Sequence, residues 1–250
     1  MGGIGIGISP IFGGLPGYSG KVLAIAPANL IAYWPLWETS GATADNLEGT
    51  AARDGGYTGV TLANSTGPDG RPVPLFDGTN GFVDIYSASL ETAFNGAEGT
   101  AAIWVKVSAA GVWTDSTARY PLTLKEDANN SVIISKFTTD NTIRFAYEAN
   151  NVIEPVADTS IGGSTAWNHL AVTWSKSSGG TGEVKGYING VQVGTTQQTL
   201  GVYAGELFIN TTVIGAVSNA PASAWSGWLA HCAVWTTPLT LAQILALATV

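Results

Sequence analysis

Two stretches decide the fold: "AWNHLAVTW" at residues 166–174 and "GYINGVQVGT" at residues 186–195. In the second stretch, Asn189 and Gly190 lie between two runs in which apolar residues alternate. An Asn-Gly pair favours the tight type I′ turn of a β-hairpin, because both residues tolerate a positive φ. Alternation with a period of two is typical of a strand with one buried face. The two stretches therefore predict neighbouring antiparallel strands.

Segments of the same kind recur along the chain, separated by turns that are rich in glycine. They cover residues 30–36, 81–86, 100–107, 131–137, 142–149 and 226–235. In the third of these, Ala101, Ile103, Val105 and Val107 would share one face of a strand. After the last segment, residues 239–250 have the apolar spacing of a short helix, for which Thr240 is a suitable N-cap. Many short strands at this spacing predict an all-β, two-sheet antiparallel sandwich that ends in a helix.

Several of these segments resemble the laminin-G-like, or concanavalin A-like, jelly-roll family. The segments are "LIAYWPLWETSGATADN" (30–46), "PLFDGTNGFVDI" (74–85), "AIWVKV" (102–107), the pair quoted first, and "GWLAHCAVWTTPLTLAQILAL" (227–247). Their order implies a jelly roll over residues 30–250, preceded by an extended arm at residues 1–29. The amino-acid sequence also resembles laminin-G-like virion proteins of tailed bacteriophages. The fold hosts lectins, glycosidases, adhesion modules and virion proteins, so the family alone does not imply one function.

Composition excludes several classes of protein. Only 11% of the 250 residues are charged and the net charge is −8, which argues against nucleic acid as a partner. No apolar run reaches the roughly 18 residues of a membrane-spanning helix. Cys232 is the single cysteine, so neither an intrachain disulfide nor a cysteine-based metal site is possible.

The first residues, "MGGIGIGISPIFGG", alternate glycine with isoleucine. A signal peptide needs a basic start and a continuous apolar run, so we expect no cleaved signal here. In an extended conformation, isoleucines would line one side and bare backbone the other. This pattern predicts an assembly arm formed by Ile4, Ile6, Ile8, Ile11 and Phe12, which docks on a neighbouring copy or another particle protein. The alternative is that the arm packs on its own domain.

Catalytic signatures are absent from the sequence. Glycosidases of this fold use an E-x-D-x-E type of strand, and none occurs here. Asp77 and Asp84 are the nearest strand candidates, and we interpret them as a turn residue and a solvent-facing residue. There is no G-x-S-x-G elbow, and His169 and His231 are interpreted as hydrogen-bonded structural residues. The sequence therefore predicts that the protein is not an enzyme.

Calcium remains an open alternative to the absence of any cofactor. Asp45, Asn46, Asp77 and Asn80 supply oxygen atoms of the kind that hold Ca²⁺. Such residues also cap turns by bonding their own backbone, and this is the interpretation we prefer. The family often carries an acidic pair in its closing strand near a calcium site. This sequence has Ala230 and His231 there, so the resemblance does not imply that site.

Aromatic residues beside loops are candidates for a binding surface. They are Trp37, Trp113, Tyr120, Tyr203 and Trp225. Aromatic faces at loop tips can stack on sugar rings, and they can equally anchor a protein interface or pack beneath the loops.

These observations favour a non-enzymatic structural protein of a virus (phage) particle. We expect it to assemble through its arm with copies of itself and other particle proteins, with glycans as a further partner. Its location would then be the virion, assembled in the host cytoplasm. The main alternative is a lectin-type module for receptor recognition. The missing carboxylate motif counts against a third alternative, a glycoside hydrolase.

Overall fold

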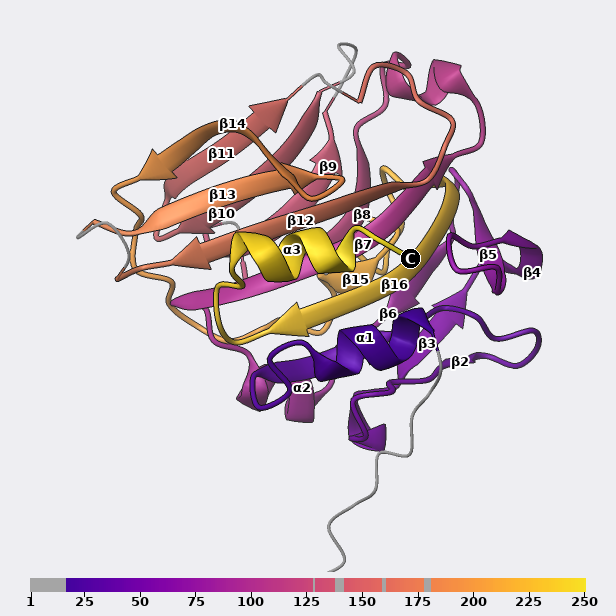
Figure 1. Cartoon of the computed structure of the whole chain (residues 1–250), viewed down its shortest axis with the longest axis horizontal. Helices are drawn as coiled ribbons and strands as arrows, with labels where there is room; N and C mark the ends of the chain where they lie inside the picture. The colour runs from indigo at the N-terminus through magenta and orange to yellow at the C-terminus, as the bar shows by residue number, and fades with distance from the viewer. Residues whose placement is uncertain (1–16, 128, 138–141, 159–160, 178–180) are drawn as a thin grey trace, which may run out of the picture.

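A computed structural model describes residues 17–127, 129–137, 142–158, 161–177 and 181–250. These residues form two antiparallel sheets packed face to face (Figure 1). Sheet A has the order β14-β13-β12-β7-β16-β5-β4, and β1 also pairs with β16. Sheet B has the order β11-β10-β9-β8-β15-β6-β3-β2. The predicted all-β sandwich with a helix at its C-terminal end is thus confirmed.

The strands of sheet A are β1 (Leu30–Trp34), β4 (Thr61–Thr66), β5 (Pro72–Asp77), β7 (Glu98–Val107), β12 (Asn168–Ser175), β13 (Glu183–Ile188), β14 (Val191–Gln198) and β16 (Ser226–Trp235). Those of sheet B are β2 (Thr43–Ala44), β3 (Gly55–Thr58), β6 (Phe82–Asp84), β8 (Arg119–Lys125), β9 (Ser131–Lys136), β10 (Ile143–Ala149), β11 (Val152–Asp158) and β15 (Thr212–Ile214). The helices are α1 (Tyr18–Ala24), α2 (Ala88–Ala93) and α3 (Leu241–Leu247), with short 3-10 turns at Ala51–Arg53 and Ala110–Trp113.

The main core lies between the two sheets and follows the alternation of the strands. Ala101, Ile103, Val105 and Val107 of β7 all belong to it, as predicted. The opposite face of β7 contributes Trp104 to a second apolar cluster. That cluster lies on the outer face of sheet A, where α1 and α3 cover the strands (Figure 1). Sheet A is therefore buried on much of both faces.

The hairpin between β13 and β14 confirms the prediction made from its sequence. Asn189 and Gly190 have φ values of 51° and 81°, the left-handed conformation that a type I′ turn requires. The Asn189 side-chain oxygen accepts a hydrogen bond from the backbone N–H of His169 at 2.8 Å. The backbone N–H of Asn189 donates in return to the His169 carbonyl. The turn is thereby fastened to β12 as well as to its own strands.

Strand β16 departs from the regular alternation expected over residues 226–235. Its register against β7 shifts between Ala230 and Ala233, and His231 has a φ of 52°. A β-bulge adds one residue to a strand and exchanges the faces beyond it. Leu229 therefore faces the main core together with Cys232, whereas regular alternation would place it with Ala233.

Residues 17–29 were expected to belong to an extended arm, and the structure corrects this boundary. They include α1, whose Tyr18 and Val22 are buried in the second cluster. The jelly-roll unit therefore extends toward the N-terminus at least to this helix. The arm residues Ile4, Ile6, Ile8, Ile11 and Phe12 lie outside the described residues.

Helix α3 begins with the predicted cap, since Thr240 and Gln243 form a reciprocal capping box. Ile244 and Leu247 are buried against sheet A. Leu241 and Leu245, which belong to the same apolar pattern of residues 239–250, are exposed.

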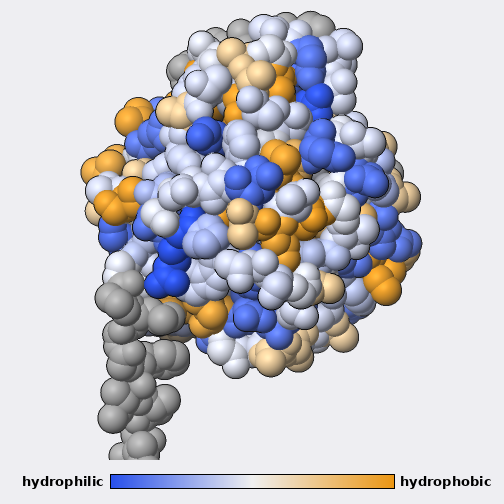
Figure 2. Space-filling view, turned by 90° about the vertical axis from the view of Figure 1, so that its right-hand side faces the viewer, coloured by the Kyte–Doolittle hydropathy of each residue, from blue (hydrophilic) through white to orange (hydrophobic). Residues whose placement is uncertain are grey.

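The surface reflects the low charge content of the chain. Figure 2 shows hydrophobic patches interspersed with hydrophilic ones on one face of the molecule. Within the described ranges, none of the helices has both the length and the apolar character needed to cross a membrane.

Candidate functional site

A groove crosses the outer face of sheet A beside the start of α3, and we call it the β13–α3 groove. It has a volume of about 240 Å³. Its lining includes residues 173–175, Glu183, Lys185, Tyr187 and Gln192 from the strands, and residues 238–241 at and just before the start of the helix. Ligand pockets for drug-sized molecules usually measure roughly 300–1,000 Å³, so this groove suits a smaller group.

The pleat of the sheet brings these side chains together. Glu183, Lys185 and Tyr187 alternate along β13 and so point to the same face. In the register of the sheet, Thr173 of β12 lies opposite Lys185, and Gln192 of β14 lies opposite Tyr187. Three adjacent strands thus present hydroxyl, charged, amide and aromatic groups in neighbouring rows.

The charged groups of the groove are paired. Lys185 Nζ lies 2.6 Å from Glu183 Oε2, and both side chains are partly exposed. The hydrogen bond from Lys185 lowers the pKa of the Glu183 carboxyl, which favours its ionised form. On β14, Gln192 Nε2 donates to the Thr196 hydroxyl at 2.9 Å. The groove therefore offers fixed donors and acceptors at its rim.

A second polar array is buried beneath α1. The Ser19 hydroxyl lies 2.9 Å from the Tyr33 hydroxyl, which lies 2.7 Å from Nδ1 of His231. On the far side of the same ring, Nε2 lies 3.3 Å from Oδ2 of Asp69. Ser19, Tyr33 and His231 are all buried. This buried array connects α1, β1, β16 and the turn between β4 and β5.

This array is structural rather than nucleophilic. Ser19 Oγ is buried, and the Tyr33 hydroxyl lies between it and the imidazole, so His231 does not contact the serine hydroxyl directly. Burial acts to raise the pKa of Asp69, but the hydrogen bond and charge of His231 outweigh it and lower that pKa. The hydrogen-bonded structural role expected for His231 is confirmed. His169 differs, because its buried Nδ1 has no partner among the described residues.

Comparison with known proteins agrees with this architecture. A family model described as the concanavalin A-like lectin/glucanase superfamily matches residues 77–245, more than half of the chain. The chain belongs to this superfamily. The family expectation from the sequence is thus confirmed, whereas the similarity to bacteriophage proteins stays a prediction. A search of curated proteins found no match.

Solved structures with the same fold include a domain of an arabinanase and the binding domains of two toxins. Domain 4 of an extracellular arabinanase from Geobacillus stearothermophilus, solved in complex with arabinotriose, has a TM-score of 0.60 and 16% identity over 88% of this chain and 98% of its own. The botulinum neurotoxin serotype D binding domain has a TM-score of 0.61 and 11% identity, and that of Paraclostridial Mosquitocidal Protein 1 has 0.62 and 15%. Both matches cover 88% of this chain and about half of the toxin domain, 50% and 52% respectively. These identities show a shared fold and nothing finer.

The aromatic candidates of this concanavalin A-like domain separate into two groups. Trp113 and Trp225 are fully buried and pack edge to face, with ring centroids 5.9 Å apart. Their indole N–H groups donate to backbone carbonyls, so their assignment as surface aromatics was wrong. Tyr203 and Tyr120 are half-buried, and Tyr203 packs against Phe94.

Trp37 remains available at the surface of the superfamily fold. Its ring is half-buried, and the Arg71 guanidinium lies over it at 4.1 Å from the ring centroid. Arg71 is also close to Asp69 of the buried array. The structure does not bring Trp37 and the β13–α3 groove together in one lining.

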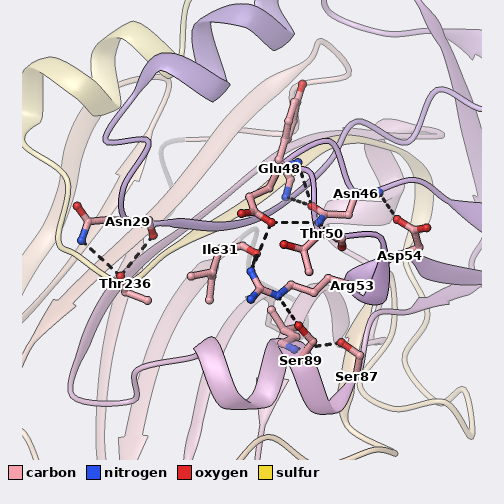
Figure 3. Close-up of polar contacts among 12 residues, drawn as sticks. Asn29, Ile31, Asn46, Glu48, Thr50, Arg53, Asp54, Ser87, Ser89 and Thr236 are labelled. Carbon is pink, nitrogen blue, oxygen red and sulfur yellow. Dashed lines mark hydrogen bonds and ion pairs between the residues drawn. The ribbon is translucent and has the colours of Figure 1, made fainter. Parts of the chain in front are cut away.

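Two of the calcium candidates, Asn46 and Asp77, use side-chain oxygen atoms to accept hydrogen bonds from backbone N–H groups. Figure 3 shows Asn46 at the centre of a network that holds the loop before β3. Its Oδ1 accepts from the Tyr33 backbone N–H at 2.8 Å, and its amide donates to the Thr50 carbonyl. Asp45 lies beside it and is exposed.

The second calcium pair behaves in the same way. Asp77 Oδ1 accepts from the backbone N–H groups of Thr79 and Asn80, as expected of a turn residue. In the described part of the chain, no group of three or more His, Cys, Asp or Glu side chains is arranged to hold a metal ion. Calcium therefore stays an untested prediction.

Two carboxyl pairs outside the groove were not anticipated from the sequence. Glu91 and Glu206 are close enough to shift each other's pKa, and so are Glu126 and Asp127. The bond from Tyr86 and then that from Glu206 lower the pKa of Glu91, while the partner carboxyl raises that of Glu206. Glycosidases need carboxyl groups about 5–9.5 Å apart to flank the bond that is cut.

Sequence reasoning missed the residues of the groove. "EVKGY" at 183–187 alternates charged and aromatic residues on one face of a predicted strand, which is a signal that could have been used. The start of α3 is more than 50 residues away in the sequence, and only the fold brings it against this strand.

Proposed function

We propose that this chain is a non-catalytic carbohydrate-binding module that holds a glycan in the β13–α3 groove. The observation that supports it is the combination of Lys185, Glu183 and Gln192 around the Tyr187 ring. An ammonium group donates, a carboxylate accepts and an amide does both, which matches the mixed hydrogen bonding of sugar hydroxyls. The arabinanase domain of the same fold was solved with arabinotriose, so pentose and hexose oligosaccharides are the first ligands to test.

The proposal excludes hydrolysis for a geometric reason. Among the described residues, Glu183 is the only carboxylate that lines the groove, and the hydrogen bond from Lys185 favours its ionised form. Glycoside hydrolysis normally requires a second carboxyl group, one of the two remaining protonated as the acid. A lone ionised carboxylate can orient a sugar but cannot supply both roles.

A glycan array followed by titration calorimetry tests this proposal. We expect the full chain to bind at least one oligosaccharide without cleaving it. Lys185→Ala should weaken that binding about tenfold, because hydrogen bonds to charged groups contribute roughly 1.5–3 kcal/mol. Gln192→Ala should weaken it less, by roughly threefold, because its amide is neutral.

The matched control is Gln197→Ala, on the same strand β14 but outside the groove lining. Its amide donates to the Thr195 carbonyl, so the change removes a comparable local bond. We expect Gln197→Ala to bind as the wild type does. The proposal would be overturned if the protein bound no glycan on the array, or if Lys185→Ala bound its glycan as tightly as the wild type.

A second candidate function is a structural component of a virus (phage) particle. The observation in its favour is an outward helix face without charge, formed by Leu241 and Leu245 of α3. On this proposal the N-terminal arm joins copies of the chain or other particle proteins, and the jelly roll forms an exposed body that contacts glycans. The location would be the virion. Its test is the solution mass of the full chain compared with a chain that lacks residues 2–16, which leaves α1 intact.

A further inference from the structure

The outward face of α3 is unlike that of a normal surface helix. The helix sequence "LAQILAL" contains no charged residue. Leu241 and Leu245 are 58% and 53% exposed, although they are four residues apart and so lie on one face. A helix that is apolar all round is normally buried, whereas a surface helix carries polar residues outward. This face is therefore built to be covered.

The apolar face continues onto the neighbouring hairpin. Val191, the first residue of β14, is 63% exposed. A Cβ atom on Gly190, the residue before it, would lie only 2.8 Å from Leu245 Cδ1, so the turn and the helix are in contact. We call Val191, Leu241 and Leu245 together the α3 patch.

The α3 patch adjoins the edge strand of sheet A, which packs against Ala157 of β11 at Gly194. β14 is the outermost strand of sheet A, and in the described residues it pairs with β13 alone. Its sequence "VQVGTTQQ" has no charge. Natural edge strands usually carry lysine, proline or a bulge against unwanted pairing, and the bulge here lies between Val193 and Gln197, so residues 191–193 form the regular part of the edge. An open edge beside an apolar face is the surface that an extended peptide recognises by strand addition.

The N-terminal segment has the complementary composition. Between Gly3 and Ile8, glycine and isoleucine alternate without charge. Extended, such a segment offers isoleucines on one side, and its glycines let another backbone approach closely. Sixteen residues precede Gly17, and an extended chain spans at most about 3.3–3.6 Å per residue. The segment therefore has a reach of roughly 55 Å.

The position of α1 favours a neighbouring copy as the source of the segment. Tyr18 Oη donates to the Leu247 carbonyl at 2.7 Å, and Lys21 Nζ donates to the Thr249 carbonyl. These bonds hold the start of α1 against the C-terminal end of α3, and the two helices run in opposite directions (Figure 1). The axis of α1, continued backwards from Tyr18, passes away from Leu241. A segment of the same chain would have to reverse to reach the patch.

We propose that residues 1–16 of a second copy of this chain cover the α3 patch. The isoleucines would bury Leu241, Leu245 and Val191, and the glycine-rich backbone would lie along the open edge of β14. This inference rests on the assembly role proposed above and names the surface that receives the arm.

Cross-linking between separately labelled chains tests the contact. One population carries Ile6→Cys and the other Leu245→Cys. The native Cys232 is fully buried, and burial raises the pKa of its thiol, so it does not compete. After mixing and mild oxidation, we expect a disulfide-linked pair of twice the chain mass that contains both peptides.

Val202→Cys is the matched control for Leu245→Cys. Val202 is 64% exposed, and it lies in the loop in which Ala204 bonds Asn130, away from α3. It should give at least tenfold less cross-linked pair. Equal yields from the two positions would overturn the proposal. So would a chain carrying both Ile6→Cys and Leu245→Cys that links only to itself at high dilution.

Light scattering separates failure of this inference from failure of the assembly role. We expect deletion of residues 2–16 and the change Leu245→Ser each to weaken self-association at least tenfold, with Val202→Ser unchanged. If only the deletion dissociates the assembly, the arm docks elsewhere and the α3 patch is not its docking surface. If only Leu245→Ser does, the patch pairs with itself and this inference fails. A full chain that stays monomeric at every concentration overturns both proposals.

Discussion

At the scale of single residues, His169 is a buried imidazole that the fold holds neutral. It packs edge to face against Trp104, with ring centroids 5.3 Å apart, and its Nδ1 has no partner among the described residues. Burial, and then the charge of His231, lower the pKa of His169 to about 3. The unfolded chain would protonate this ring near pH 6.5. Acid therefore favours the unfolded state.

His169→Phe should remove part of this acid sensitivity. The folded pKa is below the unfolded one, so the unfolded state binds more protons between about pH 3 and pH 6.5. The free energy of unfolding of the wild type should accordingly fall as the pH drops from 6.5. Phenylalanine keeps the ring contact with Trp104 and removes the unpartnered nitrogen. In urea unfolding at pH 7.0, the free energy of unfolding of His169→Phe should equal or exceed that of the wild type. Between pH 7.0 and pH 4.5 the variant should lose less of this free energy than the wild type does. Identical losses in the two proteins would contradict this account.

Which individual residues could be predicted depends on how local their partners are. Asp77 bonds the backbone two and three residues ahead, so its role as a turn residue follows from nearby sequence. Trp113 bonds the carbonyl of Ser164, 51 residues away, and packs on Trp225. Nothing beside Trp113 in the sequence indicates those partners. Loop position alone therefore misassigned it to the surface.

At the scale of elements, α3 begins directly after Thr240, the N-cap that its sequence predicts. Thr240→Ala removes the side-chain half of the capping box, which leaves the Gln243 N–H without its acceptor. Such a change usually costs about 1 kcal/mol. We expect that loss in the free energy of unfolding from urea titration. Thr249→Ala, at the other end of the same helix, should cost clearly less, and an equal cost would argue against the capping role.

Regular strands could also be predicted from local sequence. In β16 the predicted alternation breaks down for a specific reason. Alternation over 226–235 holds as far as Ala230, and then His231 takes a φ of 52° and the register shifts. That conformation is uncommon for a residue other than glycine, so the sequence pattern could not have indicated it. Contacts from distant elements accompany it: His231 Nδ1 lies beside the Tyr33 hydroxyl, and its backbone N–H donates to the Pro35 carbonyl.

At the scale of the whole molecule, α1 closes the outer face of sheet A. Trp104 Nε1 of β7 donates to the Tyr18 hydroxyl at 2.9 Å, and that hydroxyl donates to Leu247 at the end of α3. The helix thus links a central strand to the C-terminal helix. Sequence reasoning placed it in the arm. The stretch "YSGKVLA" contains a glycine and its N-cap residue makes no side-chain bond, so it carries little local signal for a helix. Its stability comes from tertiary packing, as is usual for helices this short.

Two truncations should therefore behave differently. Removing residues 2–16 leaves α1 in place, and we expect the melting temperature of the monomer to change little. Removing residues 2–26 strips Tyr18 and Val22 from the second apolar cluster and exposes what they cover. Fully burying a large apolar side chain contributes roughly 1.5–3 kcal/mol, so the loss should be about 3–6 kcal/mol. The double change Tyr18→Ala and Val22→Ala in the full chain should reproduce most of that loss, even if the longer truncation does not fold. Equal melting temperatures for the two truncations would show that α1 is dispensable to the domain.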